Sequence, residues 1–247
     1  MNKKKVGMIC ALALSVAAVG AVGSFAYFTD KSEVTNDFTT GSLDLKVTES
    51  MWSNTDDGKN MYPGYTTDKN PSVQNVTGMV DNNAYIMAQI QVKDAAGNPI
   101  TDKHRLDLIY EMIKWDPTGS NLIEGTKYSQ TTLNSYENVN PLFTTERRED
   151  SKGLWTYYYS KTLNSAAEKE AGDQITLFNK IVVPLEWSQT ELDVVGDYNI
   201  TVTFQGIQAA TFGTVSDAMN VLDGNYDDHI HTDYEENDTN RPSAGSR

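Results

Sequence analysis

Apolar and polar residues alternate along most of the chain, and this alternation predicts short β-strands. In residues 43–48, Leu43, Leu45 and Val47 alternate with polar neighbours, as expected for a strand with one buried face. The aromatic run at Trp155 has a high strand preference. Further strands are predicted at 84–93, 155–161, 176–184 and 198–204.

Turn-forming residues separate these strands. They are Asp56-Asp57-Gly58, Pro63-Gly64, Gly97-Asn98-Pro99, Pro117-Thr118-Gly119, Gly172-Asp173 and Gly196-Asp197. Many short strands with regular turns indicate a mainly β protein. We therefore predict a jelly-roll-like two-sheet sandwich over residues 27–212.

Two segments have helical character. Residues 106–115 fit both a helix face and a strand face, and the strand is favoured here. A short C-terminal helix is predicted within 213–224, where Thr214 caps the apolar stripe of 215–222 and Gly224 ends it. Residues 225–247 are acidic and polar, which predicts a disordered tail.

The first 26 residues have the organisation of a secretory signal peptide. Lysines follow the initiating methionine, an uncharged apolar run follows them, and Ser24 and Ala26 provide the small residues that precede a cleavage site. Cleavage before Tyr27 is therefore expected, and the mature protein is predicted to be secreted to the cell surface or extracellular matrix. The rival interpretation is a retained membrane anchor, since the run is near the lower length limit for spanning a bilayer.

Composition restricts the function classes. The leader holds three lysines and the only cysteine, Cys10, so its removal takes the net charge from −14 to −17 and leaves no thiol. Disulfide frameworks and cysteine-ligated metals are excluded, and a nucleic-acid partner is not expected for so acidic a body. With 10% aromatic and 38% apolar residues, the chain has enough apolar material to form a core.

No enzymatic motif stands out, so no catalytic residue and no cofactor are assigned. The chain has neither a His-Glu-x-x-His pair nor a Gly-x-Ser-x-Gly elbow. No metal site is expected. The nearest candidates are His229 and His231, two residues apart and flanked by carboxylates, in a stretch that reads more simply as solvated tail. The run at 155–159 could stack on sugars, although such runs more often fill a core.

The junction Ala26-Tyr27-Phe28-Thr29-Asp30, followed by Phe38-Thr39-Thr40-Gly41-Ser42-Leu43-Asp44-Leu45, resembles the TasA/camelysin family of Gram-positive bacteria. Further similarities follow in the family's order, at Tyr62-Pro63-Gly64, 68–75, 83–86, 155–159, 172–178 and 207–212. The resemblance implies a subunit of extracellular biofilm fibres and a signal peptidase of the SipW type. An accessory anchor protein is a further candidate partner.

The resemblance also implies that the freed N-terminal segment, residues 27–47, completes the sheet of the next subunit. Main-chain hydrogen bonds and alternate apolar side chains suit such strand addition, and a head-to-tail contact that does not close produces filaments. The expected anchors are Phe28, Val34, Phe38, Leu43 and Leu45. The alternative is that the segment folds back as an ordinary first strand of its own subunit.

Two other functions stay open. Camelysin members are classed as metallo-endopeptidases, but this sequence has no matching zinc motif. An adhesin or glycan-binding module is the other alternative.

Overall fold

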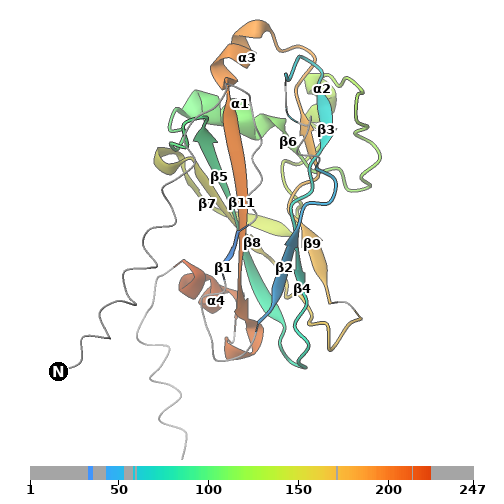
Figure 1. Cartoon of the computed structure of the whole chain (residues 1–247), viewed down its shortest axis with the longest axis vertical. Coiled ribbons are helices and arrows are strands. Elements are labelled where there is room, and N and C mark those ends of the chain that lie inside the picture. Colours follow the sequence, from blue (N-terminus) through green and yellow to red (C-terminus); the bar gives the residue numbers. More distant parts are fainter. Residues whose placement is uncertain are drawn as a thin grey trace, which may run out of the picture.

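The computed structural model describes residues 33–35, 43–52, 58, 60–170, 172–212 and 214–223. Its strands form two layers with helices at both ends (Figure 1). The strands are β1 Glu33–Thr35, β2 Leu45–Thr48, β3 Thr66–Asp68, β4 Ser72–Asn75, β5 Ala84–Asp94, β6 Ile113–Lys114, β7 Phe143–Glu149, β8 Leu154–Tyr159, β9 Gln174–Thr176, β10 Lys180–Val182 and β11 Tyr198–Gln208.

One layer is a five-stranded sheet in the order β1-β11-β5-β8-β7. The long strands β5 and β11 are antiparallel and pair over their whole length, from Tyr198 opposite Asp94 to Gln208 opposite Ala84. Their alternation matches the sequence pattern, since Ile86, Ala88, Ile90 and Val92 are all buried.

The second layer contains two three-stranded sheets, β2-β4-β9 and β3-β10-β6. The β4–β9 pair of one sheet and the β3–β10 pair of the other share one antiparallel register. Ser72 lies opposite Thr176, and Asp68 lies opposite Lys180, so the two ladders are continuations of each other. The Lys69 N–H donates to the Asn179 carbonyl at 3.2 Å and the Leu177 N–H donates to the Pro71 carbonyl at 3.0 Å, which bridges the interruption.

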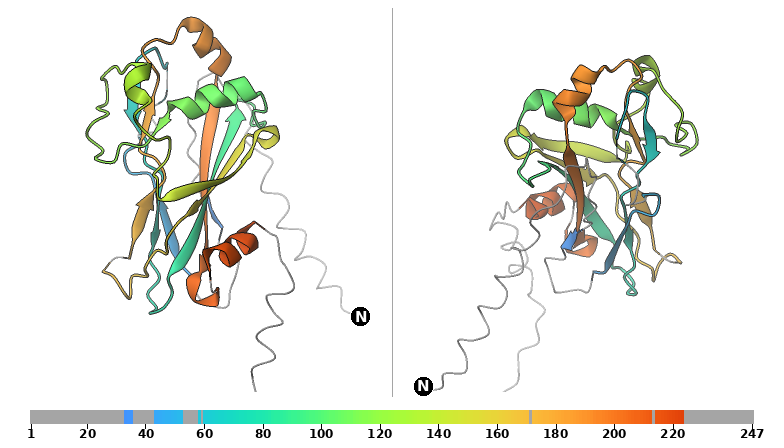
Figure 2. Two further views of the ribbon diagram at one scale, coloured as in Figure 1. Left: turned by 180° about the vertical axis from the view of Figure 1, so that it is seen from behind. Right: turned by 45° about the horizontal axis from the view of Figure 1, so that its top comes forward.

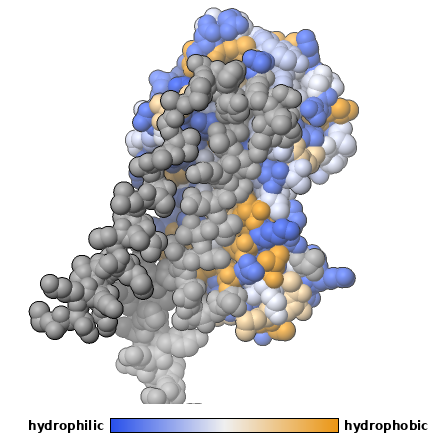
Figure 3. Space-filling model, in the orientation of Figure 1, coloured by the Kyte–Doolittle hydropathy of each residue, from blue (hydrophilic) through white to orange (hydrophobic). Residues whose placement is uncertain are grey.

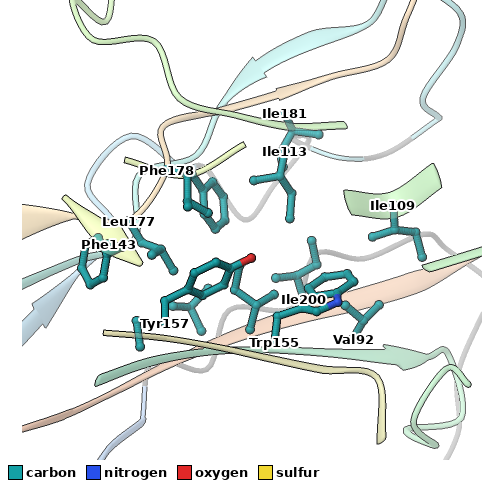
Figure 4. Close-up of a cluster of buried hydrophobic side chains, with 14 of the residues drawn as sticks. Val92, Ile109, Ile113, Phe143, Trp155, Tyr157, Leu177, Phe178, Ile181 and Ile200 are labelled. Atoms are coloured by element: carbon teal, nitrogen blue, oxygen red, sulfur yellow. The ribbon is translucent and has the colours of Figure 1, made fainter. Parts of the chain in front are cut away.

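The main core lies between the layers (Figure 4). Trp155 and Tyr157 of β8 point from the five-stranded sheet toward Leu177, Phe178 and Ile181 of the second layer. Tyr110 packs against Trp155 with ring centroids 5.2 Å apart. A second small core of Leu122, Leu133 and Val182 lies beneath the connection that contains α2.

The helices are α1 Lys103–Met112, α2 Gln130–Leu133, α3 Gln189–Val195 and α4 Val215–Leu222, with 3-10 turns at Asp150–Lys152 and Ala209–Thr211. Figures 1 and 2 show α1 and α3 at one end of the layers and α4 at the other. The predicted helix at 215–222 is confirmed, with Thr214 accepting from the Asp217 N–H.

The strand prediction for 106–115 is wrong over most of its length, because 103–112 form α1. The Asp102 side chain accepts from the Arg105 N–H at 2.8 Å and so caps the helix. Leu106, Ile109 and Met112 then share a buried helix face. Only the two residues of β6 that follow are extended.

The mainly β prediction is confirmed by these three sheets. The positive φ angles of Gly58, Gly64, Gly97, Gly119, Gly172 and Gly196 agree with the predicted turns. The predicted acidic tail, 225–247, lies outside the described residues. The described chain has four helices beyond its sheets rather than one short helix.

Candidate functional site

The side of β11 that faces β1 is the most distinctive feature of the five-stranded sheet among the described residues. β11 pairs with β5 from Tyr198 to Gln208, but on its other side β1 pairs only with Thr203–Gln205. β1 is also parallel to β11, whereas all other described pairs are antiparallel. Among the described residues, no strand pairs with 198–202 on this side.

Strand alternation determines which main-chain groups face this edge. The Ala209 N–H donates to the Asn83 carbonyl at 2.7 Å and continues the β11–β5 ladder, so odd-numbered residues of β11 are directed at β5. The even-numbered residues Tyr198, Ile200, Val202 and Phe204 therefore direct their N–H and C=O groups toward the β1 side. An edge of this kind is a template for another strand.

The opposite edge of the same sheet is protected. β7 has a register shift between Thr145 and Arg147, and bulges bend edge strands away from further pairing. Charged side chains also cover it: Arg147 contacts Glu149 at 2.8 Å and Asp223 at 3.2 Å. A hydrogen bond from Lys152, with Arg147 contributing, lowers the pKa of Glu149, so this carboxylate stays charged. Of the two sides of this sheet, the β7 side therefore has the features that oppose further strand pairing, and the described residues of β11 do not.

Leu43 and Leu45 lie against β11 at Gly206. A Cβ on Gly206 would lie 2.5 Å from Cδ1 of Leu45 and 3.1 Å from Cδ2 of Leu43. Leu45 is buried and Leu43 packs against the main core. The glycine therefore leaves the space that these side chains occupy.

From Leu45 onward, the chain is attached to its own second layer. β2 pairs with β4, with Leu45 opposite Asn75. The buried Lys69 Nζ lies 2.5 Å from Glu49 and 4.4 Å from the Trp52 ring centroid. This ion pair fixes the end of the segment, because separating two buried opposite charges costs the attraction that offsets their burial.

The structure describes three of the sequence-predicted site residues, Val34, Leu43 and Leu45. Leu43 and Leu45 lie in the subunit's own second layer, as described above. Val34 lies in β1 opposite Phe204. The other predicted residues lie outside the described residues: Ser24, Ala26, Tyr27, Phe28, Phe38, His229 and His231.

The aromatic run is not a surface feature. Trp155 is 1% exposed and Tyr157 is equally buried. Burial raises the pKa of the Tyr157 hydroxyl far above its usual range, with Tyr110 adding to the effect. These side chains belong to the core, so they are not available to stack on a sugar.

The described residues contain no group of three or more His, Cys, Asp or Glu side chains arranged to hold a metal ion. His104, the one histidine among them, is exposed on α1. These residues do not fit a catalytic metal, so we derive no metal-dependent step.

The sequence left open that the N-terminal segment folds back as a first strand of its own subunit, but it did not identify β11 as the partner of β1, because a parallel contact between residues 170 positions apart leaves no local pattern. Gly206 did indicate in the sequence that other groups approach this strand closely. A glycine within an alternating strand often marks a close approach of other groups, and here Leu43 and Leu45 make that approach.

A family model described as "Camelysin metallo-endopeptidase" matches residues 1–187. The match includes the predicted leader and ends before β11. Comparison with curated proteins and with solved structures found no significant match. Within the described part of the chain, no helix has the length and apolar character needed to cross a membrane.

Proposed function

The chain belongs to the TasA/camelysin family, and on this premise we propose that it is a secreted structural subunit of extracellular biofilm matrix fibres. After a SipW-type peptidase removes residues 1–26, the freed N-terminal segment of one jelly-roll-like subunit pairs with the β11 edge of the next. Repetition of this head-to-tail contact gives a filament.

The observation that carries this proposal is the asymmetry of the five-stranded sheet. One edge is bulged and charged, while β11 presents an edge that only the short strand β1 occupies among the described residues. Three register pairs hold β1, against eleven between β11 and β5. The N-terminal strand is therefore the element that can be exchanged at least cost to the rest of the sheet.

The register of β1 supports a donor strand of defined length. Glu33 lies opposite Thr203, and the same register continued toward the N-terminus would place Phe28 opposite Tyr198. Tyr27, the first residue after the predicted cut, would then fall one position before β11 begins. Cleavage at this point would free a strand that matches the open edge.

The segment that transfers ends before Leu43 in this proposal. Leu43 and Leu45 pack over Gly206, and Glu49 is paired with Lys69, so these residues belong to the donor's own body. Residues 27–42 would then move to the neighbour, with Phe28, Val34 and Phe38 as the apolar anchors.

Electron microscopy of the purified mature protein tests the proposal. Residues 27–247 should form fibres, whereas the uncleaved precursor and a variant lacking 27–40 should not. A peptide of residues 27–40 should bind the shortened variant, and a scrambled peptide of the same composition should not. Fibres formed by the shortened variant would show that strand donation is wrong.

The family description favours one competing function, a metallo-endopeptidase. Chelator-sensitive cleavage of casein by the mature protein, lost in a His229→Ala/His231→Ala variant, would support this activity instead.

A further inference from the structure

We infer that the loop between β4 and β5, through Met79 and Val80, is the surface on which the next copy of this chain docks. This inference rests on the proposed fibre assembly and adds a second contact to it. Val80 is 66% exposed and Met79 is 55% exposed, and the two are adjacent in sequence. Exposed apolar residues that gather at one place commonly mark an interaction surface.

Hydrogen bonds hold both ends of the loop. On one side, the Val76 N–H donates to the Asp44 carbonyl at 2.9 Å, and the Asp44 N–H donates to Thr77 Oγ1 at 2.9 Å. On the other side, the Asp81 N–H donates to Glu168 at 2.9 Å. The apolar pair is therefore presented from a fixed base, which reduces the entropy cost of binding.

The reach of the N-terminal segment places a neighbouring copy at this end of the subunit. If Thr35 pairs with Gln205 of the neighbour, eight Cα–Cα steps connect it to Leu43, and these span at most about 29 Å. Leu43 precedes Asp44, which is bonded to Val76 and Thr77 at the base of the loop. The neighbour's β11 would then lie within this reach of Leu43, at the end of the subunit that carries Met79 and Val80.

The described surface agrees with this placement. Figure 3 shows apolar residues in the lower half of the described body, over β2 and β4, and Figure 1 shows the β4–β5 loop at that end. A second copy of this chain is the occupant that we assign to this surface, because strand donation would bring its β11 within reach of Leu43.

The opposite end of the body provides a matched control. Ile123 is 57% exposed and Leu185 is 45% exposed. Both are bonded to Tyr128: the Ile123 N–H donates to its hydroxyl at 2.8 Å, and the Leu185 N–H donates to its carbonyl at 2.9 Å. This second exposed pair resembles the first in exposure but lies away from the root of the N-terminal segment.

Sedimentation of mature protein over a concentration series measures the critical concentration for assembly. Met79→Asp/Val80→Asp should raise it about tenfold or more, and Ile123→Asp/Leu185→Asp should change it less than about twofold. Both variants, shortened by residues 27–40, should still bind the 27–40 peptide, which shows that the fold and the β11 edge are intact.

The sedimentation results distinguish a failure of the docking surface from a failure of the proposed fibre assembly. Assembly of the Met79/Val80 variant at the wild-type concentration, or equal losses in both variants, overturns the docking surface while strand donation stands. A wild-type protein that forms no fibres overturns the proposed function and this inference together.

Discussion

Substituting Gly206 with alanine tests how closely Leu45 and Leu43 pack against β11. The new Cβ would lie 2.5 Å from Cδ1 of Leu45. Carbon atoms pack best at roughly 3.5–4.0 Å, so the leucine must move by about 1 Å or change rotamer. Overpacking of this kind costs about 1–3 kcal/mol of unfolding free energy.

The contact predicts a coupling between the two positions. Leu45→Ala alone should cost about 2–5 kcal/mol, because it leaves a cavity in the core. In the double variant, the alanine Cβ at 206 enters space that the leucine has left. We expect the double variant to be more stable than the sum of the single effects predicts, by about 1–3 kcal/mol.

Urea unfolding of the mature protein below its assembly concentration, followed by tryptophan fluorescence, gives the four free energies of the cycle. Gly78→Ala is the matched control, since a Cβ there has no atom within 4 Å, and its effect should be within about 0.5 kcal/mol. Additivity of Gly206→Ala and Leu45→Ala within about 0.5 kcal/mol would refute the packing argument.

Three further predictions concern the body of the subunit. Lys69→Met should destabilise the fold by about 3–5 kcal/mol in thermal or urea unfolding, because the buried Glu49 carboxylate loses the lysine charge that lies 2.5 Å from it, and Glu49→Gln in the same chain should recover part of the loss. Gly172→Ala should prevent folding as judged by circular dichroism, since its Cβ would meet the Asn75 carbonyl oxygen at 1.8 Å, whereas Gly97→Ala, with open space and a similar φ, should cost only about 1–2 kcal/mol. Burial opposes the charge of Asp116, but N–H donors from Leu122 and Asn121 outweigh it and hold its pKa below the usual 3.8. The stabilisation that the charged Asp116 side chain gives the folded state is therefore complete above the unfolded-state pKa and is lost as the pH falls through the folded-state pKa. The stability gap between wild type and Asp116→Asn should be constant near neutral pH and shrink below about pH 4; a gap that grows on acidification would contradict the assigned pKa shift.

Local patterns predicted the strands whose two faces differ. The segment 84–93 alternates cleanly, and it forms the longest described antiparallel pair with β11. The segment 106–115 carries helix and strand periodicities at once, and the capping by Asp102, which lies outside that pattern, decides in favour of the helix. α3 had a readable signal that was missed: the capping box of Ser188 and Glu191, with the Ser188 N–H donating to the Glu191 carboxylate at 2.7 Å.

The candidate site was less predictable than the fold. Signal-peptide chemistry is local and indicates where the N-terminal segment begins. The place where that segment becomes fixed depends on contacts with Gly206, Asn75 and Lys69, which are distant in sequence. No sequence feature near Leu45 tells whether a strand there pairs within its own subunit or with a neighbouring subunit.

Strand exchange requires a body that stays folded when the exchanged strand leaves. The described core draws on both layers and includes Leu45 of β2, with Leu43 packed against it. The long β5–β11 pair and the Lys69–Glu49 ion pair also lie within this remaining body. We therefore expect a variant lacking residues 27–40 to retain a cooperative unfolding transition while losing assembly. A molten or unfolded product would instead show that the segment is an integral first strand of its own subunit, and that the β1 side of β11 is not an acceptor site.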